Sequence, residues 1–93
     1  MFIGTNQEKT TLMREVIPIY LTNEMWIDNI KLQYDAKTYN NMREALAEAM
    51  DKKYIVNVEA IRNIRDGILF QHATNGSKPM LTKKGERFLK HKR

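Results

Sequence analysis

The chain contains no cysteine, and this absence excludes disulfide bonds and zinc sites with cysteine ligands. It also lacks any apolar run near the roughly 20 residues that a membrane-spanning helix requires. The first residues do not form the apolar segment of a signal peptide. We therefore expect a cytoplasmic protein without a membrane partner.

Motifs that carry enzyme chemistry are missing as well. There is no glycine-rich phosphate loop, and no pair of carboxylates or Ser/His/Asp set occurs at a recognisable spacing. Ser77 is the only serine, and it falls at a loop tip without an evident base. The two histidines, His72 and His91, have no suitably spaced carboxylate partner. We expect no catalytic residue, no metal site and no cofactor.

Charge is unevenly distributed along the chain. The formal net charge of the 93 residues is +5, but residues 1–51 hold five Lys/Arg against eight Asp/Glu. Residues 52–93 hold eleven Lys/Arg against three Asp/Glu. If the partner is a polyanion, the second half of the chain is expected to bind it.

The length predicts one domain over residues 1–93, because a chain of this size closes one hydrophobic core. Burial of apolar surface against a second copy would stabilise so small a domain, and we expect a homodimer.

The first half of the chain reads as helical after a loose arm at residues 1–7. Apolar residues have helical spacing from Glu8 to Leu21, where Pro18 is expected to kink or end the helix near Ile17. An apolar stripe from Met25 to Tyr34 predicts a second helix. The alanine-rich segment from Thr38 to Lys53 predicts a third, and is the clearest helix in the chain.

The segment from Asn57 to Asp66 has two interpretations. Val58, Ile61 and Ile64 recur at helical spacing after a good N-cap residue, whereas alternation through Val56, Val58 and Ala60 is typical of a strand. We favour the helix, with Gly67 as its C′ residue.

A hairpin and a final helix are predicted to follow. Ile68–Ala73 reads as a strand, Thr74–Pro79 as a turn-forming tip and Met80–Thr82 as the return strand. Lys83–Lys92 then has a helical pattern. The expected fold is mainly α with a small β-hairpin, in the order of a winged helix-turn-helix.

Two phrases of the sequence carry a family resemblance. LAEAMDKKYIVNVEAIRNIRDGIL is similar to the support helix, turn and recognition helix of winged-helix regulators. MLTKKGERFL is similar to the return strand and following helix of these families. The resemblance covers about residues 38–90 and implies a site-specific protein that binds double-stranded DNA.

Two helices compete for the role of reader. KTYNNMREALAEAM also resembles recognition helices of PadR-like regulators, and the chain as a whole resembles PadR/MarR-like regulators. Its Glu44, Glu48 and Asp51 would face phosphates unfavourably, and we therefore favour the Asn57 helix.

The residues expected to contact DNA fall into two groups. Those predicted to read bases, through side chains that match base edges, are Asn57, Glu59, Arg62 and Asn63. Those predicted to contact phosphates, or to lie on the wing, are Lys52, Lys53, Arg65, His72, Thr74, Asn75, Ser77, Lys78, Lys83 and Lys84.

The size and layout resemble the small AspA-type centromere-binding proteins of archaeal plasmid partition. This resemblance implies a homodimer on a palindromic DNA site, working with a partition adaptor and a Walker-type ATPase. A small viral or plasmid transcriptional repressor is the alternative, and a winged-helix module that binds protein instead of DNA is another.

Overall fold

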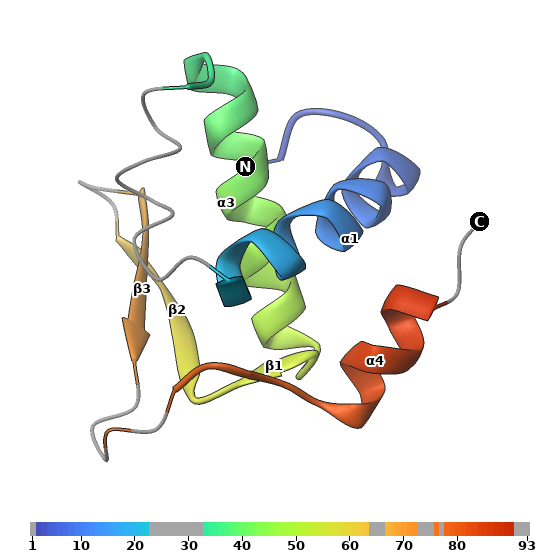
Figure 1. The fold of residues 1–93 in the computed structure, drawn as a ribbon. Coiled ribbons are helices and arrows are strands. Elements are labelled where there is room, and N and C mark those ends of the chain that lie inside the picture. The colour runs from blue at the N-terminus through green and yellow to red at the C-terminus, as the bar shows by residue number, and fades with distance from the viewer. Residues whose placement is uncertain (1, 23–32, 64–66, 73–75, 77, 91–93) are drawn as a thin grey trace. The chain divides into compact units, whose positions relative to one another are not determined.

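The computed structural model describes residues 2–22, 33–63, 67–72, 76 and 78–90 (Figure 1). Within these residues the elements are α1 (Asn6–Thr22), α3 (Ala36–Asp51), β1 (Ile55–Val56), β2 (Val58–Asn63), β3 (Gly67–His72), β4 (Met80–Leu81) and α4 (Lys83–Lys90). The fold is mainly α with a small antiparallel β component, as the sequence predicts. The chain divides into two compact units, Met1–Leu46 and Ala47–Arg93, which we call unit 1 and unit 2.

Unit 1 begins with a capped helix. The Thr5 hydroxyl accepts a hydrogen bond from the Glu8 amide, and the Glu8 carboxylate accepts one from the Thr5 amide. This reciprocal pair is a capping box, and α1 therefore starts at Asn6, inside the segment predicted as a loose arm. The residues before α1 are held by the Asn41 side chain, which forms two hydrogen bonds with the backbone of Ile3.

Pro18 does not end α1, which continues to Thr22. The prediction that the helix could end near Ile17 was therefore wrong. Pro18 lies on the exposed side of the helix. The opposite face of the helix is buried and is stabilised by apolar contact, with Met13, Val16, Ile17 and Tyr20 all in the core.

The helix predicted at Thr38–Lys53 is confirmed as α3. Asp35 caps it, because its carboxylate accepts a hydrogen bond of 2.7 Å from the Thr38 amide. From Met42 onward most of its residues are buried, including Ala45, Leu46 and Ala49. Most of the helix predicted from Met25 to Tyr34 falls within residues 23–32, which lie outside the described residues.

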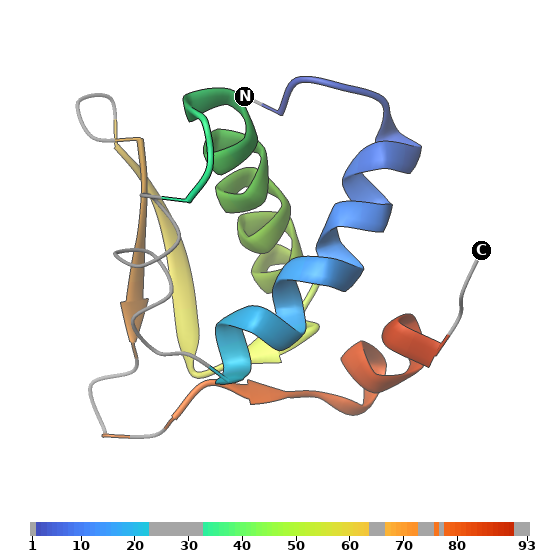
Figure 2. The ribbon, with the colours of Figure 1, turned by 45° about the horizontal axis from the view of Figure 1, so that its top comes forward.

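The predicted recognition helix at Asn57–Asp66 was wrong. Asn57 has a φ of 70°, and Val58–Asn63 form β2, paired antiparallel with β3 (Figure 2). Val58 faces His72 and Asn63 faces Gly67 in this register. The alternating pattern, which we placed second, is the one the chain follows.

The pairing of the later strands also differs from the predicted hairpin. β3 and β4 are strands close to the predicted ranges, but they do not pair with each other. Instead β4 pairs with β1, so that Ile55 faces Leu81 and Val56 faces Met80. The final helix is confirmed as α4. Within the described ranges, no helix is both long and apolar enough to cross a membrane.

Candidate nucleic-acid interface

Unit 2 brings together lysines from two distant parts of the sequence. Lys52 and Lys53 follow the end of α3, and Lys83 and Lys84 begin α4. The Thr82 hydroxyl donates to the Lys53 carbonyl at 2.7 Å, and the Thr82 amide donates to the Tyr54 carbonyl at 3.0 Å. These bonds fix the start of α4 beside the end of α3. We call Lys52, Lys53, Lys83 and Lys84 the lysine cluster.

Thr82 also caps α4. Its hydroxyl oxygen accepts a hydrogen bond of 2.9 Å from the Gly85 amide, and its carbonyl accepts one of 2.8 Å from the Glu86 amide. One side chain therefore starts the helix and ties it to the preceding chain. Sequence reasoning placed Thr82 in the return strand and missed this role. A threonine directly before a helical pattern was the available indication.

Aromatic contacts set the position of α4 against the chain at Tyr54. The rings of Tyr54 and Phe88 stack with centroids 4.4 Å apart. The Lys84 ammonium lies 5.5 Å from the centroid of the Tyr54 ring. Gly85 is buried, and a Cβ atom there would lie only 2.3 Å from the Tyr54 carbonyl oxygen. The close approach of α4 thus depends on a residue without a side chain.

All four lysines of the cluster are exposed. In the part of the chain that the structure describes, Lys52, Lys53 and Lys83 form no ion pair, and Lys84 contacts the Tyr54 ring. Lys83 and Lys84 also stand in the first turn of α4, where the helix dipole disfavours positive charge. The positions of these lysines are therefore explained neither by ion pairs among the described residues nor by a gain in helix stability.

The residues predicted to read bases do not share one helical face. Asn57 donates from its side chain to the Lys78 carbonyl at 2.9 Å, a bond that joins the start of β2 to the segment before β4. Glu59 and Arg62 are both exposed in β2, but an odd separation along a strand puts them on opposite faces. Asn63 ends β2, and its side chain lies outside the described part.

Most of the predicted wing residues cannot be placed. Arg65, Thr74, Asn75 and Ser77 lie outside the described residues. His72 ends β3, and Lys78 is exposed. Of the predicted phosphate contacts, the structure therefore gathers the four lysines of the cluster.

The alternative reader, the first turn of α3, is partly accessible. Lys37 is exposed, and Thr38, Tyr39 and Asn40 are half-buried. Arg43 is less available, because its guanidinium carbon lies 5.6 Å from the centroid of the Tyr39 ring and its Nε is buried.

No group of three His, Asp or Glu residues is placed to hold a metal ion in the described ranges. No protein-family model matches the chain, and comparisons with curated proteins and with solved structures found no match. The case for function therefore rests on the residues themselves.

Proposed function

We propose that this chain binds double-stranded DNA, with the lysine cluster of unit 2 as its phosphate-contacting surface. The observation that carries the proposal is the hydrogen bonding of Thr82, which joins two lysine pairs about thirty residues apart in sequence. A surface of exposed ammonium groups that have no acidic partner among the described residues attracts a polyanion, and each phosphate contact releases condensed counterions.

Two features favour a polyanion over simple solvation of these charges. The hydrogen bonds of Thr82 bring two segments with two lysines each to the same part of unit 2, where phosphates could contact lysines of both. The two lysines at the start of α4 also oppose the helix dipole, so they reduce stability when nothing is bound.

Salt dependence of binding tests the proposal directly. Affinity for a random-sequence duplex is measured by fluorescence anisotropy at several salt concentrations. The single variants Lys53→Gln and Lys83→Gln should each reduce the slope of log K against log salt by about 0.9, the value for one lost phosphate contact on B-DNA. The fourfold Lys→Gln variant of the cluster should reduce it by about 3 to 4.

Lys9→Gln is the matched control, since it removes one lysine charge from unit 1, where the Lys9 ammonium lies over the Phe2 ring. Circular dichroism verifies that each variant is folded. The proposal fails if Lys9→Gln changes the slope as much as Lys53→Gln does, or if the fourfold variant keeps the wild-type slope.

For sequence reading, we propose the first turn of α3, because the Asn57 segment is a strand and recognition helices contact bases through their N-terminal residues. Selection from a random duplex library separates the two readers. Asn40→Ala should change the selected sequence if α3 reads it, whereas Arg62→Ala should change it if β2 enters the groove as part of a ribbon.

The selected site also separates the biological roles. A palindromic site would favour a homodimer. Protection that spreads outward from it at rising protein concentration would favour marking of a partition site, and protection confined to it would favour a repressor. Failure to select any sequence would favour the protein-binding module.

A further inference from the structure

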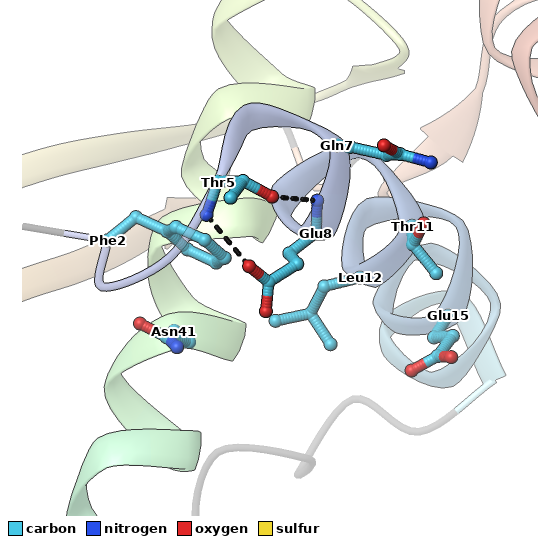
Figure 3. A pocket seen from close by; sticks show the side chains of 8 residues that line it. All are labelled: Phe2, Thr5, Gln7, Glu8, Thr11, Leu12, Glu15 and Asn41. Atoms are coloured by element: carbon cyan, nitrogen blue, oxygen red, sulfur yellow. Dashed lines mark hydrogen bonds between the residues drawn. The ribbon is translucent and has the colours of Figure 1, made fainter.

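Unit 1 contains a pocket that the proposed DNA contacts do not use. Its volume is about 380 Å³, and it is lined by Phe2, Thr5, Gln7, Glu8, Thr11, Leu12, Glu15 and Asn41 (Figure 3). A volume in this range is typical of sites for small molecules. The lining combines two carboxylates with an apolar part, and among the described residues it contains no lysine or arginine.

The wall of the pocket formed by the N-terminal residues is held in place. Asn41 donates to the Ile3 carbonyl at 3.0 Å and accepts from the Ile3 amide at 2.9 Å. Gly4 has a φ of 147°, and a Cβ atom there would lie 3.0 Å from the Phe2 ring. These contacts hold the segment that places Phe2 in the lining of the pocket.

The two carboxylates follow one face of α1. Glu8 and Glu15 are seven residues apart, a rise of roughly 10 Å along a helix, and Leu12 lies between them (Figure 3). Glu15 is exposed and forms no ion pair in the described part. Hydrogen bonds from Thr5, with help from the charge of Lys37, lower the pKa of Glu8 and keep its carboxylate ionised.

The apolar part of the lining also suits a cation on an aliphatic chain. The Lys9 ammonium lies 5.8 Å from the centroid of the Phe2 ring, so this ring already has a cation of the chain itself, and the ligand's ammonium groups are assigned to the carboxylates. Leu12 offers a surface for methylene groups between the two charges. Carboxylates at both ends of an apolar stretch match a molecule with two ammonium groups at the ends of a short aliphatic chain.

We infer that this pocket binds an aliphatic di- or triamine, with one ammonium group at Glu8 and another at Glu15. The charges of the site and ligand are complementary, and the volume fits a small molecule better than a folded partner. This inference does not depend on DNA binding, since it concerns residues of unit 1 alone.

The test uses the full chain without DNA and follows backbone amide NMR shifts during titration. The probes are 1,4-diaminobutane, spermidine, butylamine and the neutral 1,4-butanediol. Both polyamines should shift the amides of α1 residues around Glu8 to Glu15. They should bind about two- to fivefold more tightly than butylamine, the gain expected from a second exposed ion pair.

Glu15→Gln is the decisive variant, since Glu15 is exposed and takes no part in the capping box. It should abolish the advantage of the diamine over butylamine. Glu86→Gln removes the same charge from an exposed residue of α4, and it should leave the advantage of the diamine over butylamine unchanged. Equal binding of butanediol, or an unchanged preference in Glu15→Gln, would overturn the inference. Tighter binding of a capped Lys-Lys dipeptide than of spermidine would also overturn it, because the site would then suit a protein partner.

Discussion

Replacing Gly85 with alanine should destabilise the protein, although alanine is the better helix former. The added Cβ atom would lie 2.3 Å from the Tyr54 carbonyl oxygen and 2.7 Å from a Leu81 methyl group. An ordinary carbon to oxygen contact is about 3.3 Å or more, so α4 must move away from Tyr54 by about 1 Å. The Tyr54 carbonyl belongs to the backbone, which cannot move aside as the end of a flexible side chain can.

The magnitude follows from two opposing effects. Overpacking of this kind costs about 1–3 kcal/mol, and a shift of α4 would also weaken the bonds of Thr82 to Lys53 and Tyr54. The helix preference of alanine over glycine returns at most about 1 kcal/mol. We expect a net loss of about 1–2 kcal/mol, which for a domain of this size lowers Tm by about 5–15 °C.

Urea denaturation and thermal melting, both followed by circular dichroism, measure the effect. Glu86→Ala is the control, since Glu86 neighbours Gly85 in α4 and is exposed. A Gly85→Ala protein as stable as the wild type, or more stable, would show that helix preference dominates and that α4 does not pack closely on Tyr54.

Three further predictions concern local structure. Thr82→Val should cost about 1–2 kcal/mol in urea denaturation because the cap and the link to the preceding chain both disappear, whereas Thr82→Ser should stay within about 0.5 kcal/mol of the wild type; equal losses would remove the hydroxyl from the explanation. Backbone hydrogen bonds from Thr5 and Thr38 lower the pKa of Glu8 and of Asp35, so their contribution is complete above the ordinary values of 4.5 and 3.8 and is lost as pH falls through the lowered pKa values. The urea midpoint should therefore fall between pH 6 and pH 3, and by less in Asp35→Asn; an identical fall would exclude Asp35 as a source. Asn57→Ala should be more destabilising than Asn57→Gly, by about 1 kcal/mol, because a φ of 70° is unfavourable for alanine; since both variants lose the side-chain bond to Lys78, equal losses would place the whole effect in that bond.

Local pattern was sufficient for the helices. The alanine-rich composition of α3 and the helical spacing in α1 predicted both elements. Pro18 misled because its local cost is outweighed by burial of the opposite face of α1, which depends on residues outside the window around the proline.

The error at β2 has a different cause. Val58, Ile61 and Ile64 satisfy helical spacing, but β-branched residues also favour strands. Pairing with β3, in which Val58 faces His72 and Ile61 faces Leu69, decides between the two. That pairing is tertiary information. Ile61 and Leu69 face each other in the register and are 40% and 45% exposed. The usual alternation of buried apolar and exposed polar residues is therefore weak in these two strands.

The lysines of the candidate site were predicted from the sequence, but their proximity in the fold was not. All four lysines of the cluster were among the residues predicted to contact phosphates, from the charge of the second half together with the expected winged-helix layout. Their proximity depends on hydrogen bonds between Thr82 and residues nearly thirty positions earlier, which no local pattern reveals.

The cluster is also a place where the sequence acts against its own stability. Lys83 and Lys84 occupy a helix start that favours acidic residues, and α4 has a single acid, Glu86, in its first turn. The Thr82 cap and the Tyr54–Phe88 stack nevertheless hold the same segment in place. A firmly anchored segment that carries charges unfavourable for its own helix is expected where a protein binds a ligand of opposite charge. A chain selected only for stability would gain from an acidic residue in place of Lys83, and this cost supports the proposal of a polyanionic partner.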